Sequence, residues 1–189
     1  METNMICKPL EKENWQDFEK LFGANGACSG CWCMFWRLRN KDFQPNTDEG
    51  NRKAMQKLVS DGIVPGLLGY VDGEPVAWVA IAPRTEYIRL ENSKVLARVN
   101  DQPVWSIVCF FIEHHHRRKG LMLQLIRAAV KYAQEHGAAI VEAYPIETSQ
   151  KLSGWSSYMG LAQVFKQAGF IEVARHSEHR PNMRYRIIK

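Results

Sequence analysis

The sequence predicts an α/β fold in which a mixed β-sheet is flanked by helices. Three features of the 189-residue chain lead to this prediction: a tight hairpin, a long apolar strand, and a strong amphipathic helix that a further strand follows. A hairpin joins antiparallel strands, whereas a strand–helix–strand crossover joins parallel ones. The predicted sheet therefore contains both strand directions.

The composition is that of an ordinary globular protein, with 46% hydrophobic and 24% charged residues, and the length favours one domain over residues 1–189. No apolar run approaches the roughly 20 residues that cross a bilayer, and no signal stretch opens the chain. We therefore expect a cytoplasmic protein without a membrane partner. The five cysteines, an odd number, favour reduced thiols. The net charge of +5 suits an anionic partner, and charge alone leaves nucleic acid, a membrane surface and a phosphate-bearing cofactor open.

The N-terminal part, residues 1–62, is predicted to be helical. Aromatic and leucine side chains recur at helical spacing over residues 10–22, which indicates an amphipathic helix. A helix-start signal at Asn46-Thr-Asp-Glu opens a second helix, which Gly62 closes.

Residues 66–189 are predicted to form the sheet and the cofactor-binding core. The β-rich runs 66–71 and 76–82 are joined by Asp72-Gly73, a dipeptide that favours a tight hairpin because both residues tolerate positive φ. The polar connection over residues 84–103 has the length of a lid or binding loop. We expect a short helix in it at residues 93–98.

Residues 104–112 form a nearly continuous apolar run, which is typical of a central strand covered on both faces. From Gly120 to Gly137 apolar residues recur at spacings of three and four, which predicts the strongest helix of the chain. Residues 139–144 then form a strand parallel to the central one. The remaining predicted elements are a helix between Ser156 and Gly169 and two terminal strands, 171–175 and 183–188.

The predicted central strand enters the strong helix through a basic turn. A helix N-terminus leaves backbone N–H groups unpaired and carries partial positive charge, so it binds phosphate groups. Gly120 lets the backbone approach a ligand closely, and Arg117, Arg118 and Lys119 add cationic donors. The turn alone is equally compatible with a solvated basic loop. The order of the elements around it favours a phosphate site.

Arg117-Arg-Lys-Gly-Leu-Met resembles the (Gln/Arg)-x-x-Gly-x-(Gly/Ala) signature of the GNAT superfamily of acyl-CoA-dependent N-acyltransferases. Arg117 and Gly120 match the signature, whereas Met122 stands where the family has glycine or alanine. Lys166-Gln-Ala-Gly-Phe is similar to the end of the family's helix before its sixth strand. The resemblance covers residues 66–175.

This resemblance implies a V-shaped opening between the strand that ends at Ile112 and the strand over residues 139–144. It implies acetyl-CoA as co-substrate, no bound metal, and an oxyanion stabilised by an N–H group at the end of the strand. The acceptor would be an amine of a small molecule or a protein, bordered by residues 28–36 and 84–103, and a homodimer is possible. The predicted cofactor-binding residues are Phe110, Phe111, Ile112, Glu113, Arg117, Arg118, Lys119, Gly120, Leu121 and Met122.

Direct attack by an amine needs a base, and it benefits from an acid that protonates the departing thiolate. Glu142 and Tyr144 share one face of their strand because side chains two residues apart point the same way. We predict Glu142 as the base. The tyrosine that the family uses as the acid is replaced by Phe165, which leaves Tyr144, Tyr158 or water for this role.

Two further signals concern metals. Cys28, Cys31 and Cys33 would need Cys7 or a histidine to complete a zinc site, and packing of small thiols among aromatic rings explains them more simply. The run His114-His-His is not expected to chelate an ion, because adjacent side chains in a turn diverge.

Nucleic acid is not expected as a partner, because Trp78 and Trp105 belong to strand patterns and not to a stacking platform. Two functions other than catalysis stay open. One is a non-catalytic acyl-CoA sensor, and the other is a zinc- or redox-regulated interaction module built on Cys28, Cys31 and Cys33.

Overall fold

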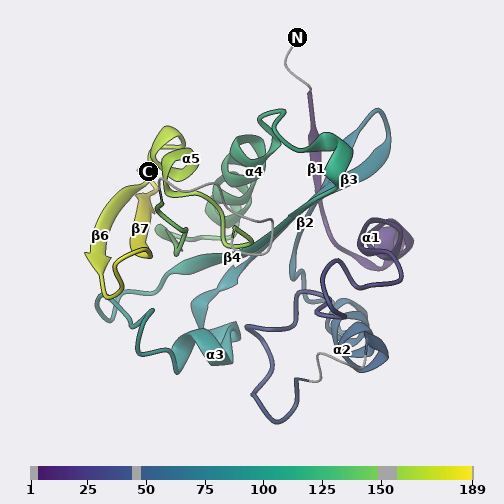
Figure 1. The fold of residues 1–189 in the computed structure, drawn as a ribbon, viewed down its shortest axis with the longest axis horizontal. Coiled ribbons are helices and arrows are strands. Elements are labelled where there is room, and N and C mark those ends of the chain that lie inside the picture. Colours follow the sequence, from purple (N-terminus) through teal and green to yellow (C-terminus); the bar gives the residue numbers. More distant parts are fainter. Residues whose placement is uncertain (1–3, 44–47, 149–156, 189) are drawn as a thin grey trace.

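The computed structural model describes residues 4–43, 48–148 and 157–188. Its centre is a seven-stranded sheet with the order β1-β2-β3-β4-β5-β7-β6, in which β4 and β5 are parallel and the other pairs that the structure describes are antiparallel (Figure 1). This confirms the predicted mixed sheet. The strands are β1 (Ile6–Pro9), β2 (Gly66–Val71), β3 (Glu74–Pro83), β4 (Trp105–Ile112), β5 (Ile140–Ala143), β6 (Ile171–Arg175) and β7 (Pro181–Arg186).

Helices cover both faces of the sheet, with α4 and α5 on one side and α1, α2 and α3 on the other (Figure 1). The α-helices are α1 (Trp15–Phe22), α2 (Asp48–Ser60), α3 (Ile88–Glu91), α4 (Leu121–Glu135) and α5 (Ala162–Gln167). Short 3₁₀ turns occupy η1 (Lys12–Asn14), η2 (Arg84–Glu86) and η3 (His114–His116). None of the helices in the described residues is long and apolar enough to span a membrane.

Each face of the sheet has its own hydrophobic core. Along β3, Trp78 and Ala80 pack with α1 and α2, whereas Val79 and Ile81 pack with α4. All four side chains are buried, because neighbouring side chains of a strand point to opposite faces and both faces are covered. The apolar runs of β3 and β4 reflect this double coverage.

The structure differs from the sequence prediction in a few elements. Strand β1 was not predicted; it is a four-residue edge strand that leaves Ile6 exposed. The short helix of the 84–103 connection is α3, not residues 93–98. The guanidinium of Arg84 donates hydrogen bonds to two carbonyl groups of this connection, that of Leu90 within α3 and that of Leu96 within the predicted helix.

Other boundaries shift by a few residues. Helix α1 begins at Trp15 after a 3₁₀ turn, and β7 begins two residues earlier than predicted, at Pro181. The predicted starts of two helices, Asn46 and Ser156, lie outside the described residues. The helix that follows Ser156 begins at Ala162.

Candidate active site

The turn between β4 and α4 exposes a run of main-chain donors. Arg118 and Gly120 have φ of 62° and 78°, in the left-handed region. Gly120 is the N-cap of α4, so no side chain there occupies the first N–H groups of the helix. The Gly120 carbonyl accepts from Leu123 and Gln124 at 3.2 and 3.4 Å. Within the described chain, no acceptor is recorded for the N–H groups of residues 118–122. Five consecutive amides are therefore available to a ligand.

Gly120 has a backbone conformation that shapes this turn. A Cβ atom built on it meets no heavy atom of the protein within 4 Å, so the protein itself does not crowd this position. Its positive φ is the constraint, because only glycine adopts this conformation without strain. The residue shapes the turn that presents the amides.

Cations surround these amides. Arg118 and Lys119 are exposed and form no ion pair with any residue that the structure describes. Arg117 donates from Nε to the Ile112 carbonyl at 2.9 Å, which holds its guanidinium beside the end of β4. Leu121 is buried and Met122 is partly buried, so their side chains anchor α4 to the core while their main chains face the turn. This donor set fits the diphosphate of a CoA molecule.

The parallel strands separate beside this turn. Pairing of β4 with β5 extends only from Trp105 opposite Val141 to Ile107 opposite Ala143, where β5 ends. Strand β4 continues to Ile112. The residues that follow Ser156 border the resulting gap, and Gly160 packs there so closely that an added Cβ would lie 2.7 and 3.0 Å from two phenylalanine rings.

The edge of β4 that faces the gap is only partly free. The Phe110 N–H on this edge donates to the Tyr158 carbonyl at 2.6 Å, whereas the Glu113 N–H is on the opposite edge and donates to the Val76 carbonyl of β3 at 2.9 Å. Neither amide is therefore open to a ligand in this structure. Ile112 lies two residues from Phe110 on the same edge, beyond the end of β5. It is a better position for a donor to the cofactor than Phe110.

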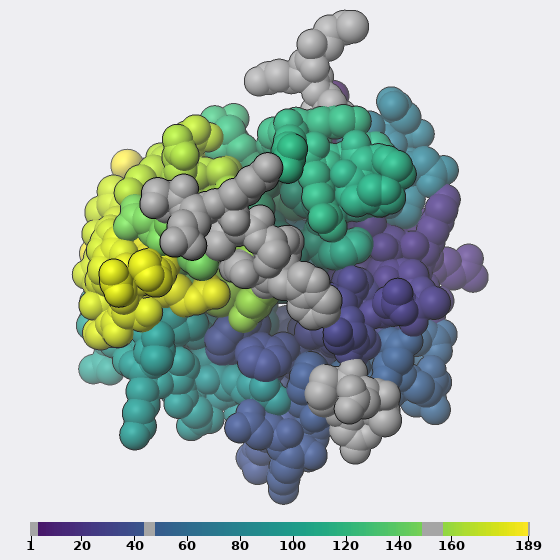
Figure 2. Space-filling model, viewed as in Figure 1, coloured from purple at the N-terminus to yellow at the C-terminus, as the bar shows by residue number. Residues whose placement is uncertain are grey.

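A cavity of about 600 Å³ lies between the second half of β4 and the N-terminal segment, residues 22–43. Figure 2 shows the strand-to-helix turn in green directly above this segment in purple. The cavity is lined by Phe22, Gly26, Ala27, Cys28, Ser29, Cys31, Cys33, Phe35, Phe43, Cys109, Phe110, Phe111, Arg117 and Tyr158. It therefore joins three predicted cofactor residues (Phe110, Phe111 and Arg117), one predicted catalytic tyrosine and the cysteine segment.

The pKa values of two lining groups, the Tyr158 hydroxyl and the Cys33 thiol, are shifted in opposite directions. Burial raises the pKa of Tyr158 to about 12, so its hydroxyl stays protonated at neutral pH. Burial also opposes ionisation of Cys33. Hydrogen bonds from Cys109 and Trp78, together with the charge of Arg37, nevertheless lower the pKa of this thiol. The Trp78 Nε1 atom lies 3.1 Å from the Cys33 sulfur.

A sequence profile of the acetyltransferase (GNAT) family matches residues 32–152, more than half of the chain. The chain belongs to the GNAT acetyltransferase family. It is an acyl-CoA-dependent N-acyltransferase that uses acetyl-CoA as co-substrate and an amine as acceptor. No curated protein sequence matches the chain at a significant level.

Solved structures share the fold of this GNAT chain. The polyamine N-acetyltransferase of Drosophila melanogaster is 10% identical with a TM-score of 0.58, over 97% of this chain and 100% of that one. The PaiA N-acetyltransferase of Thermoplasma acidophilum, in complex with coenzyme A, is 9% identical with a TM-score of 0.56, over 97% and 99%. A GNAT acetyltransferase of Listeria monocytogenes is 12% identical with a TM-score of 0.58, over 97% and 95%.

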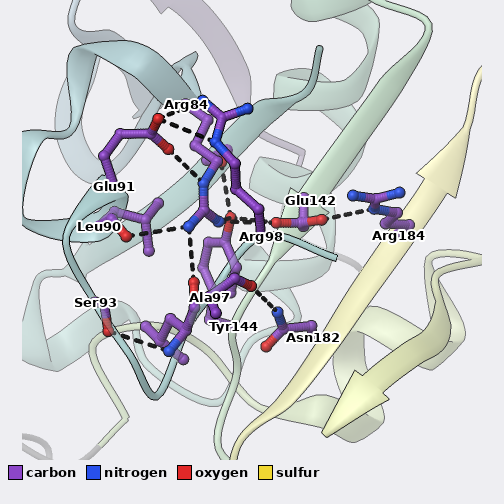
Figure 3. Close-up of polar contacts among 12 residues, drawn as sticks. Arg84, Leu90, Glu91, Ser93, Ala97, Arg98, Glu142, Tyr144, Asn182 and Arg184 are labelled. Atoms are coloured by element: carbon purple, nitrogen blue, oxygen red, sulfur yellow. Dashed lines mark hydrogen bonds and ion pairs between the residues drawn. The ribbon is translucent and has the colours of Figure 1, made fainter. Parts of the chain in front are cut away.

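In this GNAT domain, Glu142 and Tyr144 do not line the cavity. Both are fully buried in a polar network, which Figure 3 shows, between β5 and the 84–103 connection. The Glu142 carboxylate pairs with Arg84 at 3.0 Å and with Arg184 at 2.6 Å. The Tyr144 hydroxyl donates to Glu142 at 2.6 Å and accepts from Arg84 at 2.6 Å. This environment argues against Glu142 as the base and against Tyr144 as the acid.

The network explains why the 84–103 connection is not an open lid. Arg84 also pairs with Glu91 at 2.6 Å, and Asn182 donates to the Ala97 carbonyl at 3.2 Å. The Arg184 guanidinium donates to the side chain of Asn100 at 3.1 Å. The connection is thus fixed to β5 and β7 along most of its length.

The histidine run differs from the expectation that its side chains diverge. Among the described residues, Glu113, His114 and His115 are the group whose ligand atoms lie within 4.8 Å of one another, so these adjacent side chains do not diverge as expected. The His116 ring also contacts Glu113 at 2.9 Å. No such group includes the cysteines of residues 28–33 in the described chain.

Sequence reasoning missed three features of the site. Cys109 lines the cavity beside Cys33, although its place in an apolar strand suggested only core packing. Phe43 lines it too, from a segment with no clear periodicity. The positive φ of Gly160 and its contact with Phe110 were also unforeseen, although a glycine directly before an amphipathic helix was a usable signal.

Proposed function

We propose that this acetyltransferase moves the acetyl group of acetyl-CoA to a primary amine by direct attack, in the cavity beside the gap between β4 and β5. The observation that carries the proposal is the run of five main-chain amides over residues 118–122, without acceptors in the described chain, at the start of α4. Acetyl-CoA supplies the activated acyl group as a thioester. The protein binds it, orients it and handles protons.

Binding of the anionic end falls to the turn. The amides of residues 118–122 and the positive end of the α4 dipole favour a diphosphate. Arg118 and Lys119 add positive charge, and neither has to break an ion pair within the described chain to contact the ligand. Arg117 is held at the mouth of the cavity by its bond to Ile112. Ile112 itself faces the gap, where its main chain is placed to hold the pantetheine arm.

Tyr158 is the group best placed to act as the acid. It lines the cavity, and its raised pKa keeps the proton on the hydroxyl. Protonation of the departing thiolate by a positioned acid contributes a factor of about 10² to 10⁴ in many enzymes. No carboxylate or imidazole is found among the described lining residues, so we assign attack to the amine that enters in its neutral form. The C–N bond forms and the C–S bond breaks, the thiolate takes the Tyr158 proton, and the resulting phenolate takes the proton that the attacking nitrogen loses.

The test is a transfer assay in which mass spectrometry detects the acetylated amine and the release of CoA is followed in parallel. We expect acetyl-CoA to raise the melting temperature, because a ligand that binds only the native state stabilises it, and an amine panel to yield an acetylated product. Stabilisation by acetyl-CoA without transfer to any amine would identify a sensor and refute the proposal.

A further inference from the structure

The lining of the cavity is unusually apolar for a site that receives an amine. Five of its side chains are phenyl rings, and four more are thiols. These rings come from three separate segments of the chain and converge on one space. They are Phe22, Phe35, Phe43, Phe110 and Phe111.

The rings of Phe35 and Phe43 form a defined wall of this space. Their centroids lie 5.5 Å apart, and their planes are perpendicular at 90°. The guanidinium of Arg89 lies over both rings, at 4.2 and 4.8 Å from their centroids, which holds this pair together. A further ring inserted beside them can adopt the offset or edge-to-face arrangements that aromatic pairs prefer. The volume of about 600 Å³ lies within the range of small-molecule sites.

The charge of the lining also limits which amine the cavity can bind. Arg117 is the one formally charged side chain among the described residues that line the cavity, and it is a cation. Glu142, a strand residue near the gap, is closed off by its two arginine partners. An acceptor with several ammonium groups would have to bury a second cation without a carboxylate partner and near Arg117. Both desolvation and repulsion oppose this.

We propose that the acceptor is an arylalkylamine, that is, a single primary amine on an apolar aromatic body, and not a polyamine. This inference rests on the proposed function, because it names the substrate class of the same site. The aromatic body occupies the space between Phe35, Phe43 and Phe111, and the amine points to the end of β4. Fold neighbours named for polyamine or agmatine acetylation do not decide this point, because only the fold is shared at 9–10% identity.

The experiment compares kcat/KM for 2-phenylethylamine and tryptamine with kcat/KM for putrescine and spermidine, with acetylated products identified by mass spectrometry. Binding of acetyl-CoA is measured separately by calorimetry. We expect the arylalkylamines to be preferred by about 100-fold or more, which corresponds to losing roughly 2.7 kcal/mol for one unpaired cation.

A charge variant sharpens the comparison. Ser29 lines the cavity, is exposed and has φ of 51°, a conformation that aspartate tolerates better than most residues. Ser29→Asp places a carboxylate in the cavity. It should raise kcat/KM for putrescine about tenfold relative to 2-phenylethylamine. Ser60→Asp, at the exposed end of α2 and away from the lining, is the matched control and should leave this ratio unchanged.

The outcomes separate the two proposals. A preference for spermidine or putrescine in the wild type overturns the arylalkylamine inference and leaves the acetyltransferase proposal standing. So does a ratio that Ser29→Asp does not change. Binding of acetyl-CoA without acetylation of any arylalkylamine also overturns the inference. Absence of acetyl-CoA binding together with absence of transfer refutes the proposed function itself.

Discussion

Replacing Glu142 by glutamine tests whether this buried carboxylate is structural. The substitution keeps the shape of the side chain and removes the charge that faces the guanidinium groups of Arg84 and Arg184. Arg84 keeps a second carboxylate partner in Glu91, whereas Arg184 keeps only the amide oxygen of Asn100 among its contacts in the described chain. Removal of one member of a buried ion pair costs about 3–5 kcal/mol. For a chain of this length, about 2–4 °C of melting temperature is lost per kcal/mol, so Tm should fall by about 6–20 °C.

The assay is denaturant and thermal unfolding followed by circular dichroism, with kcat measured on the folded protein. Glu147→Gln is the matched control, because Glu147 also pairs with two cations, Lys166 and Arg175, but at the surface. Exposed pairs contribute only about 0–1 kcal/mol. Equal destabilisation by both variants would refute the structural role of Glu142. A large loss of kcat at unchanged stability would instead identify Glu142 as the base.

Two further predictions concern protons. Tyr158→Phe should lower kcat by about 100-fold at unchanged affinity for acetyl-CoA, and an unchanged kcat would exclude Tyr158 as the acid. Because burial raises the pKa of Tyr158 to about 12, the wild-type rate should show no loss from its ionisation up to about pH 10. Hydrogen bonds from Lys166 and Arg175 lower the pKa of Glu147 in the folded protein, so its stabilising contribution is complete above about pH 4.3 and is lost as the pH falls through the folded-state value. Unfolding free energy measured against pH should therefore fall less steeply below that pH in Glu147→Gln than in the wild type, and parallel curves would contradict this.

The parts of the fold that the sequence predicted are those with local patterns. The Asp72-Gly73 hairpin and helix α4 depend on turn chemistry and on periodicity over neighbouring residues, and both are confirmed. Strand β1 has only four residues at the edge of the sheet, so its apolar pattern is too short to stand out. Helix α3 depends on contacts of Arg84 that no local pattern encodes.

The same distinction applies to the site. The amide run at residues 118–122 lies within one turn, so the basic, glycine-containing turn before an amphipathic helix, together with the order of the elements around it, could indicate it. Glu142 is paired with residues 58 and 42 positions away in the chain, and strand alternation alone could not reveal that these partners enclose it. The cavity likewise combines the N-terminal segment with Cys109 and Tyr158, which only the tertiary structure brings together.

The most direct test of the cofactor site compares two glycines at opposite ends of α4. Gly120 and Gly137 have nearly equal φ, 78° and 81°, and an added Cβ meets nothing within 4 Å at either position. Gly120→Val and Gly137→Val should therefore lose similar stability, about 1–2 kcal/mol each. Calorimetry should show that acetyl-CoA binds Gly120→Val at least about tenfold more weakly than the wild type and binds Gly137→Val with wild-type affinity. Equal affinity of the two variants for acetyl-CoA would contradict the placement of the diphosphate on the amides of residues 118–122.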